Sequence, residues 1–390
     1  MVSSMNIGGV EKSLISLISV IPKDKYDITI LTLEKKGGFL EYIPKHVKLK
    51  EAEWFKDIRP IIMESPQNTI KRYLRARKIF KIPSFIYSYY KSKNTGDRYI
   101  YYKNILKSIP NNNEYYDAAI AYAGPTEIID AYVTHKVNAN KKIGWVHFDI
   151  SQHNINKKLY EKLYQKIDKI FAVSNEANKK LNEIIPNTIS KSEVLLNIIS
   201  KDLINEMAEE NVEFDNEFDG IKIVTVGRLS KEKGQDLAIK ALSKLKEDNY
   251  KVRWYCVGEG NSRSEYEELI RKNKLEKDFI LLGATPNPYP YIKNSDIYVQ
   301  TSRHEGYCLT LAEAKALRKP IISTNFIGAY EQLQDKVNGL IVKGDENEIY
   351  KGIKKLISNE KLISELTNNL KEIDVSTVDN VNKLIDYIES

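Results

Sequence analysis

Residues 297–317, IYVQTSRHEGYCLTLAEAKAL, change from a strand pattern to a helix pattern within a few positions. The first four residues are a short apolar and aromatic run, and the last nine have the composition of an amphipathic helix. A polar turn that contains glycine joins the two. The stretch therefore predicts a strand-to-helix connection of the kind that recurs in α/β proteins.

The same alternation of short strands and helices extends in both directions along the chain. It predicts parallel sheets that are covered by helices on both faces. In the first half of the chain, strands are expected at 26–33, 116–122, 142–147, 170–173 and 194–197. In the second half, they are expected at 221–226, 252–257, 279–282, 297–300, 321–323 and 339–342.

A chain of 390 residues exceeds what one core usually supports, so two domains are expected. The acidic, polar stretch EMAEENVEFDNEFDG (206–220) is predicted to be the linker between the two series of strands. In the first domain, a glycine loop, MNIGGVEKS, should follow directly on a strand, yet only residues 1–4 precede it. We therefore expect a truncated first strand and a native start upstream of Met1.

The net charge of +7 is divided unevenly between the two halves. The first 200 residues carry 32 Lys and Arg against 20 Asp and Glu. Much of this excess falls in residues 71–107, where eleven basic residues and one acidic residue alternate with Tyr, Phe and Ile. Such a segment suits an anionic membrane surface. An ordinary solvated face is the alternative, and no nucleic-acid-binding motif accompanies the segment.

Composition and hydropathy are those of a soluble globular protein, with no apolar run near the roughly 20 residues that a membrane-spanning helix needs. No signal-peptide pattern is present, so we expect a cytoplasmic protein that is peripheral at the inner face of the cell membrane. Cys256 and Cys308 are expected to be buried thiols, and no metal site is predicted.

Ligands of open parallel sheets bind at the carboxyl ends of the strands, where helix N-termini attract anions. The turn VGRLSKEKG supplies Arg228 and Lys233, which can hold a diphosphate from two directions. In VGEG, Gly258 allows close backbone approach, although a plain turn is the simpler interpretation. Ordinary surface charges are the alternative for Arg228 and Lys233.

In the stretch 297–317, Gly306 leaves room for a ligand before the helix begins. The amides of Tyr307, Cys308 and Leu309 at the helix start can receive a phosphate. A carboxylate just before this point, Glu305, should then face a neutral polyhydroxyl group, while Glu313 could accept hydroxyls of a second sugar. The pattern suits a nucleotide-sugar, although either glutamate alone could be an ordinary helix residue.

Glu305 and Glu313 with seven residues between them, together with GRLSKEKG, NIGGVEKS and VNGLIV, resemble the family 4 retaining glycosyltransferases. The resemblance implies a GT-B architecture, in which two Rossmann-like doubly wound parallel-sheet domains face each other across a cleft. An acceptor-binding domain is then expected at 1–200 and a donor-binding domain at 201–372. A final helix at 373–390 should cross back to the first domain.

The resemblance also implies roles for single residues. Arg228 and Lys233 correspond to the pair that neutralises the departing diphosphate. Glu305 corresponds to the acid that binds the sugar hydroxyls, and Glu313 to the acid that binds the ribose. Gly8 and Gly9 correspond to the glycine loop over the phosphates. His147 corresponds to a histidine near the reacting carbon.

The sequence departs from the family pattern after the first acid. Many members have an aromatic residue and a glycine there, where this chain has Tyr307 and Cys308.

The implied activity is metal-independent transfer, with retention, of a hexose or N-acetylhexosamine from a nucleoside-diphosphate sugar. Uridine is the expected base. The implied acceptor is a saccharide on a polyprenyl diphosphate, in synthesis of a capsule or another surface polysaccharide. Because no D-x-D motif occurs, cations and helix amides would have to meet the diphosphate charge. A nucleotide-sugar epimerase of GT-B fold and a non-catalytic donor-binding subunit of a transferase remain as alternatives.

Overall fold

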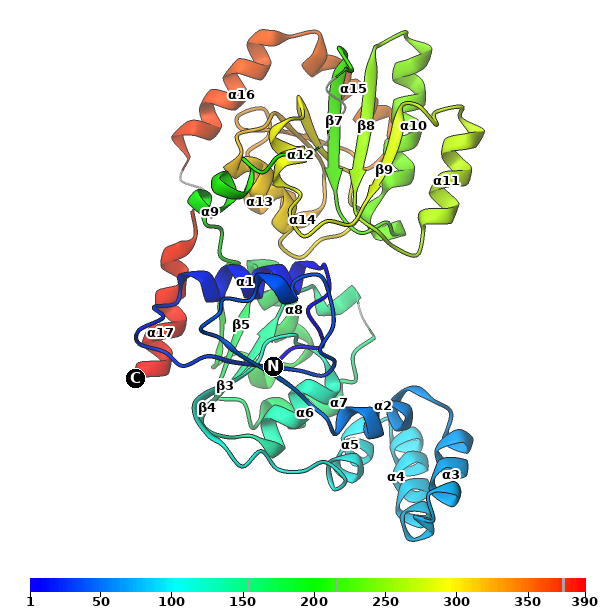
Figure 1. Cartoon of the computed structure of the whole chain (residues 1–390), viewed down its shortest axis with the longest axis vertical. Helices are drawn as coiled ribbons and strands as arrows, with labels where there is room; N and C mark the ends of the chain where they lie inside the picture. The colour runs from blue at the N-terminus through cyan, green and yellow to red at the C-terminus, as the bar shows by residue number, and fades with distance from the viewer. Residues whose placement is uncertain (153, 213, 215–216, 374–375) are drawn as a thin grey trace. The chain divides into compact units, whose positions relative to one another are not determined.

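The computed structural model describes residues 1–152, 154–212, 214, 217–373 and 376–390, which form two compact units (Figure 1). The first unit comprises Met1–Asn6, Val10–Leu196 and Val381–Ser390, and the second comprises Ile7–Gly9 and Asn197–Asn380. The division after Leu196 lies a few residues before the expected position 200. The predicted linker, 206–220, lies inside the range of the second unit, and its residues 213, 215 and 216 are outside the described residues, as are 374 and 375 of the predicted final helix.

The strands of the first unit pair in parallel throughout. A two-stranded sheet joins β1 and β2, and a four-stranded sheet has the order β3-β4-β5-β6. Five of these six strands overlap predicted ranges, and β2 was not predicted because its sequence, KLKE, is short, polar and half-exposed. The strands are β1 (Thr29–Thr32), β2 (Lys48–Glu51), β3 (Tyr115–Ala121), β4 (Asn138–Val146), β5 (Lys169–Ala172) and β6 (Ser192–Val194).

The residues before the glycine loop fill the place between the two sheets of the first unit. Val2 forms a parallel bridge to Thr32, with its N–H donating to the Leu31 carbonyl over 3.0 Å. On the other side, the Tyr122 N–H donates to the Met1 carbonyl over 3.1 Å. Met1 and Val2 thus supply the strand that the glycine loop needs before it, in a position between β1 and β3.

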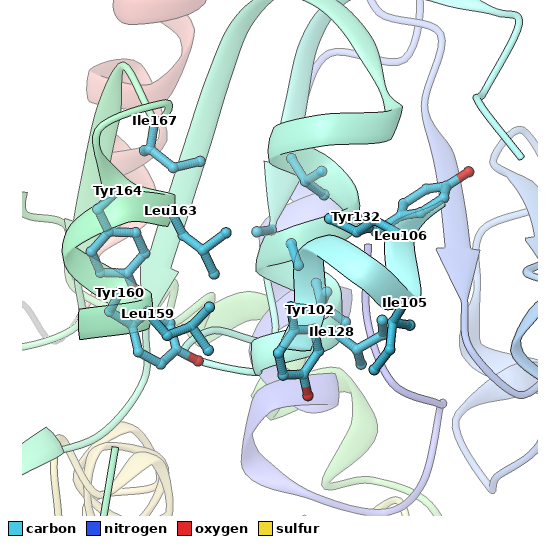
Figure 2. Close-up of a cluster of buried hydrophobic side chains, with 14 of the residues drawn as sticks. Tyr102, Ile105, Leu106, Ile128, Tyr132, Leu159, Tyr160, Leu163, Tyr164 and Ile167 are labelled. Atoms are coloured by element: carbon cyan, nitrogen blue, oxygen red, sulfur yellow. The ribbon is translucent and has the colours of Figure 1, made fainter. Parts of the chain in front are cut away.

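Helices pack against these strands through a core rich in tyrosine. Figure 2 shows Tyr102, Ile105 and Leu106 of one helix beside Ile128 and Tyr132 of another, with the apolar face of a third helix close by. The helices of the first unit are α1 (Gly9–Val20), α2 (Phe55–Met63), α3 (Pro66–Arg75), α4 (Ile82–Thr95), α5 (Arg98–Leu106), α6 (Glu127–Lys136), α7 (Lys157–Tyr164), α8 (Asn175–Ile184) and α17 (Val381–Glu389).

The last helix, α17, belongs to the first unit. The Lys141 ammonium donates to the Tyr387 carbonyl over 2.5 Å, and the ring of Tyr387 lies edge-on to that of Phe171 at 6.5 Å. Lys383 donates to the Val194 carbonyl over 3.0 Å at the end of β6. The final helix therefore closes the side of the sheet formed by β4, β5 and β6.

The second unit has one six-stranded parallel sheet in the order β12-β11-β10-β7-β8-β9. All six strands overlap the predicted ranges. They are β7 (Ile221–Val226), β8 (Val252–Val257), β9 (Phe279–Gly283), β10 (Ile297–Gln300), β11 (Ile321–Thr324) and β12 (Leu340–Val342). The order reverses between β7 and β10, which are neighbours in the sheet although two strands separate them in the sequence.

Helices cover both faces of this sheet, as the long runs of buried residues in its strands require. The helices are α9 (Lys201–Met207), α10 (Gln235–Glu247), α11 (Arg263–Lys272), α12 (Tyr289–Lys293), α13 (Leu309–Ala316), α14 (Ile327–Gln332), α15 (Glu346–Ile357) and α16 (Glu360–Glu372). α9 packs on α12 and α13, and the Asn287 amide donates to the Met207 carbonyl over 2.8 Å. This packing puts α9 and the start of the predicted linker within the second unit.

Candidate functional site

The candidate site of the second unit lies at the carboxyl ends of β7 and β10. These neighbours mark the point where the strand order reverses, and open α/β sheets bind their ligands at such a point. The loop after β7 runs from Gly227 to Gly234, and the loop after β10 runs from Thr301 to Cys308. The predicted residues Arg228, Lys233 and Glu305 all belong to these two loops.

Lys233 and Glu305 form an ion pair between the two loops. The side chain of Lys233 is 24% exposed and that of Glu305 is 10% exposed, so solvent screens the pair only partly. Burial opposes the charge on Lys233, but the Glu305 carboxylate outweighs it, and the pKa of Lys233 is raised from its ordinary value. Lys233 is therefore charged near neutral pH, and the sequence did not reveal that it pairs with Glu305.

A chain of hydrogen bonds from β10 orients Glu305. The buried Gln300 amide donates to the Ser302 hydroxyl over 2.7 Å and more weakly to Glu305 Oε1 over 3.4 Å. The Ser302 hydroxyl donates to the same Oε1 over 2.7 Å. Gln300 is itself held by the hydroxyls of Tyr298 and Thr310, which donate to its Oε1 over 2.6 and 3.3 Å. Sequence reasoning missed this network, although a glutamine at the end of a buried strand was a usable signal.

Backbone contacts bind the two loops to each other. The Thr301 hydroxyl donates to the Lys233 carbonyl over 2.9 Å, and the Arg303 N–H donates to the Glu232 carbonyl over 2.7 Å. The Arg303 guanidinium holds both oxygens of Asp236 in α10, over 2.8 and 2.7 Å. Gly234 has a φ of +69°, and a Cβ there would lie 2.2 Å from the Thr301 carbonyl oxygen. The close contact thus explains the glycine that follows Lys233.

Arg228 begins the same loop and is exposed. Its carbonyl accepts the buried Gln235 amide over 2.9 Å, which fixes its backbone against the start of α10. Its charge lowers the pKa of Lys233, against the effect of Glu305, so the two cations lie within electrostatic reach of each other. Within the described ranges, Arg228 forms no ion pair, and its guanidinium is available to a ligand.

The N-terminus of α13 presents backbone amides beside Glu305. Cys308 precedes the helix with φ 60° and ψ 73°, a left-handed conformation that favours glycine and explains why glycine suits this position. The carbonyls of Tyr307 and Cys308 accept the Gln332 side chain of α14. In the part of the chain that the structure describes, no acceptor faces the amides of Tyr307, Cys308 and Leu309.

Glu313 lies one turn into α13 and is almost fully buried, at 2% exposure. Its Oε1 accepts the hydroxyl of Tyr289, from α12, over 3.1 Å. The structure gives Glu305 and Glu313 different protein partners. Both glutamates nevertheless influence the same tyrosine, Tyr298. Burial is the largest cause that raises the pKa of Tyr298, and Cys308, Glu313 and Glu305 raise it further.

Gly258 and Gly328 have backbone neighbours that account for their size, and the neighbour of Gly328 is the predicted site residue Gly306. A Cβ at Gly258, where φ is +152°, would lie 2.0 Å from the Gly227 carbonyl oxygen. The glycine therefore permits the loop after β8 to pack on the loop after β7. The carbonyl of Gly306 lies 2.9 Å from where a Cβ of Gly328 would be, so the loop after β10 is also packed closely against α14.

The remaining predicted residues belong to other parts of the chain. Gly8 lies in the bend before α1, and Gly9 is the first residue of that helix. His147 follows β4 in the first unit, and its Nε2 lies 2.8 Å from the Tyr122 carbonyl oxygen, so Nε2 carries the proton. Burial lowers the pKa of His147 to about 4, although the Tyr122 carbonyl opposes the shift. The imidazole is therefore neutral at physiological pH.

The described residues contain neither a metal-ligand cluster nor a membrane-spanning helix. No group of three or more His, Cys, Asp and Glu side chains is arranged to hold a metal ion within that part of the chain. Among its helices, none combines the length and the hydrophobicity needed to cross a bilayer.

The second unit matches a known family of proteins. Residues 208–373 fit the family model described as "Glycosyl transferases group 1". This range contains both loops of the candidate site and the whole six-stranded sheet.

Two curated relatives carry transferase names. The chain is 32% identical over 219 residues to an N-acetylgalactosamine-N,N'-diacetylbacillosaminyl-diphospho-undecaprenol 4-alpha-N-acetylgalactosaminyltransferase of Campylobacter jejuni, covering 56% of this chain and 58% of the relative. It is 26% identical over 230 residues to the GPI3 subunit of the phosphatidylinositol N-acetylglucosaminyltransferase of Saccharomyces cerevisiae, covering 57% and 48%. The chain thus spans about half the length of these relatives.

Solved structures match the whole chain, and one of them is an Anabaena protein. The Anabaena protein Alr3699/HepE in complex with UDP-glucose has a TM-score of 0.70 and 15% identity, with coverage of 100% of this chain and 98% of that one. At this identity the match establishes the fold. The segment 208–373 is therefore similar to the glycosyl transferases group 1 family, and the chain as a whole has the two-domain α/β architecture called GT-B.

Proposed function

We propose that the protein is a retaining glycosyltransferase of the family 4 type. It would move a hexose or N-acetylhexosamine from a uridine-diphosphate sugar to a saccharide acceptor. The observation that carries the proposal is the Lys233–Glu305 pair, which places a cation and a carboxylate side by side at the switch point of the sheet, next to the amides of α13. A nucleotide-sugar has an anionic diphosphate joined to a neutral polyhydroxyl ring, and the site offers one group for each.

In this proposal, each residue acts on a different part of the donor. Lys233, Arg228 and the amides of Tyr307, Cys308 and Leu309 stabilise the diphosphate as its negative charge develops on departure. Glu305 accepts hydrogen bonds from the sugar hydroxyls, held in place by Ser302 and Gln300. Glu313 accepts the ribose hydroxyls, with Tyr289 as its support.

The proposal gives smaller roles to the glycine loop and to His147. Gly8 and Gly9 would approach the donor phosphates through their backbone. His147 would contact the sugar as a neutral group, because its lowered pKa prevents it from carrying a charge near pH 7. A phosphate oxygen of the donor would take the proton of the acceptor hydroxyl, so no side-chain base is assigned.

We further propose that the transfer needs no metal ion, since two cations and a helix N-terminus already face the diphosphate position. Calorimetric titration with UDP, GDP, ADP and CDP, each with EDTA and with Mg²⁺, tests this directly. UDP binding that is equal under both conditions supports the proposal. Binding that requires Mg²⁺ contradicts the metal-free site, and a preference for another nucleotide contradicts the choice of uridine.

The role of Lys233 is tested by comparing Lys233→Ala with Lys231→Ala. Lys231 belongs to the same loop but is 78% exposed, and it pairs with Glu265 instead of Glu305. Because a lost charge-assisted contact costs about 1.5–3 kcal/mol, Lys233→Ala should slow UDP release from UDP-sugars roughly 10- to 100-fold. UDP affinity should fall less than turnover. Equal losses in both variants would contradict the assignment.

The proposed acceptor is a saccharide linked to a polyprenyl diphosphate, in the synthesis of a cell-surface polysaccharide. The support comes from the relatives, since the Campylobacter jejuni transferase is named for a diphospho-undecaprenol saccharide and the yeast enzyme for phosphatidylinositol. The proposal places the reaction at the inner face of the cell membrane, with the protein bound there peripherally. Transfer from a radiolabelled UDP-sugar to undecaprenyl-diphosphate saccharides, compared with the same free saccharides, tests the lipid requirement.

A further inference from the structure

Exposed apolar side chains gather on one part of the first unit. Phe80 is 76% exposed and Met63 is 72% exposed, values that are unusual for such large hydrophobic groups. Seven exposed large hydrophobic side chains fall within 28 consecutive positions of the described chain, namely Met63, Leu74, Ile79, Phe80, Ile86, Tyr87 and Tyr90. They belong to α3, α4 and the turn between them, with Met63 at the end of α2.

The same segment is strongly basic. Residues 65–95 contain eight Lys and Arg and no Asp or Glu. Of these eight, Arg72 alone has an acidic partner among the described residues, Glu64 at 2.9 Å. The positive charge on this surface is therefore not neutralised by the protein. The eight are Lys71, Arg72, Arg75, Arg77, Lys78, Lys81, Lys91 and Lys93.

α3 and α4 form a hairpin that stands out from the sheets of the first unit (Figure 1). Its inner side is fixed by aromatic contacts, because Phe85 packs against Tyr73 at 5.8 Å and against Tyr101 of α5 at 6.0 Å. The outer side of α4 carries Ile86 and Tyr90 four positions apart. The apolar stripe is therefore presented by an anchored element.

Only part of the basic, aromatic segment 71–107, which the sequence singled out, forms an exposed surface in the structure. Its second part, α5, faces inward, since Tyr102, Ile105 and Leu106 lie in the core (Figure 2). Only the part up to α4 forms an exposed surface. Residues 98–107 are excluded from it, although their composition resembles that of the hairpin.

We infer that the α3–α4 hairpin is a docking surface for an anionic lipid bilayer. Ile79 and Phe80 at the turn enter the interface between headgroups and acyl chains, while Arg75, Arg77 and Lys78 contact lipid phosphates. The inference deepens the proposed function, on which it rests for the choice of a membrane-linked acceptor.

A bilayer is the partner that matches both features of the surface. Nucleic acid would attract the cations, but it offers no apolar layer for side chains as exposed as Phe80. A bilayer has an anionic layer directly above an apolar one, and tyrosines such as Tyr87 and Tyr90 are favoured at the boundary between them. The Lys91 ammonium lies 5.1 Å from the Tyr87 ring centre and donates to its hydroxyl, so charge and ring already occupy the same face.

The test is sedimentation of the full chain with sucrose-loaded vesicles, either of pure phosphatidylcholine or with about one-third phosphatidylglycerol, at low and high salt. Wild type should bind the anionic vesicles at low salt and be released by high salt. Ile79→Ser with Phe80→Ser should weaken binding at least about tenfold. Arg75→Gln with Lys78→Gln should weaken it roughly 25-fold, since each basic residue near an anionic surface contributes about fivefold.

Matched controls lie elsewhere on the first unit. Ile189→Ser removes a side chain that is 62% exposed outside the hairpin, and Lys45→Gln with Lys179→Gln removes two exposed cations. These controls should bind vesicles as wild type does. The inference would be overturned if wild type did not bind the anionic vesicles, if the controls lost as much binding as the hairpin variants, or if the Ile79/Phe80 variant bound fully. It would also be overturned if duplex DNA displaced the protein from the vesicles while the Ile79/Phe80 substitutions did not weaken vesicle binding.

Calorimetric UDP titration without vesicles separates this inference from the proposed function. The hairpin variants should bind UDP as wild type does, which also shows that they are folded. If wild type binds vesicles but no nucleotide, the proposed function fails and the docking surface stands. If it binds UDP but no anionic vesicle, the docking surface fails and the proposed function stands.

Discussion

At the scale of single residues, the ion pair between Lys233 and Glu305 determines which groups a ligand meets at the candidate site. The Glu305 carboxylate pairs with the Lys233 ammonium, which a diphosphate would also need. A diphosphate must therefore compete with Glu305 for Lys233. A sugar-bearing donor compensates by offering hydroxyls to the displaced carboxylate, whereas bare UDP does not. Under the proposed function, the pair would thus favour the complete donor over the nucleotide product.

This competition predicts opposite effects of Glu305→Gln on binding and on turnover. Without the carboxylate, Lys233 is free for the diphosphate, and UDP should bind at least about fivefold more tightly, the equivalent of roughly 1 kcal/mol. Turnover of the UDP-sugar should fall, because the sugar loses its acceptor. Calorimetric titration and UDP-release assays measure the two effects, with Glu259→Gln, which affects an exposed pair with Arg263, as the control. Weaker UDP binding by Glu305→Gln would contradict the competition.

The residues of the site could be named from the sequence, but their contacts could not. Glu305, Gly306 and Glu313 stand out because they surround a strand-to-helix turn within nine positions. The contact between Lys233 and Glu305 joins residues 72 positions apart, and it depends on β7 and β10 being neighbours. Ser302 escaped notice because serine is common after a strand. Gln300 was a usable signal, as a polar residue at the end of a buried strand, but the sequence does not reveal its hydrogen-bond partners.

At the scale of elements, Gly234 decides how closely the loop after β7 approaches the loop after β10. In Gly234→Ala, the alanine must adopt the left-handed backbone conformation. The Thr301 carbonyl oxygen must also move, because it lies 2.2 Å from the added Cβ. Gly96 has nearly the same φ, +65° against +69°, and nothing lies within 4 Å of its added carbon. The two glycines therefore separate the cost of conformation from the cost of contact.

Gly96→Ala should lower the free energy of unfolding by about 1 kcal/mol, the cost of the left-handed conformation alone. Gly234→Ala should lower it by roughly 3 kcal/mol, because the strained contact adds to that cost. UDP binding should weaken in Gly234→Ala and not in Gly96→Ala. Chemical denaturation and calorimetric titration give the two values. Similar losses of stability in both variants would show that the loops can separate without penalty.

Most elements could be predicted from the sequence because buried parallel strands are short apolar runs between helices. The strand β2 was missed because it is an edge strand with the polar sequence KLKE, which carries no such signal. The composition of 71–107 was read as one surface, yet α5 turns its aromatic residues inward. Composition alone cannot tell a buried tyrosine from an exposed one, since both faces of these helices contain Tyr and Ile.

At the scale of the whole molecule, groups with shifted pKa values make the first unit sensitive to acid. Burial lowers the pKa of His147 and of His135 from 6.5 to about 4, and neighbouring lysines add to the effect at His135. Below pH 6.5 the two histidines therefore bind protons in the unfolded chain but stay neutral in the folded chain. Their contribution to the free energy of unfolding is fully present above pH 6.5 and is lost as the pH falls towards 4. Asp130 has the opposite effect, since burial raises its pKa from 3.8 to about 7.

Variants of these groups should change the pH dependence of stability in opposite directions. His147→Gln should flatten the fall in the free energy of unfolding between pH 6.5 and 4.5, by up to about 3 kcal/mol. Asp130→Asn should steepen it, because it removes a group that gains stability as the pH falls from 7. Urea denaturation at half-unit pH steps, followed by tryptophan fluorescence, measures both slopes. Parallel slopes in wild type and His147→Gln would exclude the histidine as a cause.

The return of α17 to the first unit affects how the protein is made. The first unit is assembled from segments on both sides of the second, since Val381–Ser390 packs with residues that precede Leu196. During synthesis, the residues of the second unit up to Asn380 are all added to the chain before α17 is complete. The unit that emerges first is therefore the last to be finished. Until then, the surface of β5 and β6 that Tyr387 and Lys383 will cover stays exposed. A chaperone can bind there for as long as the second unit is being synthesised.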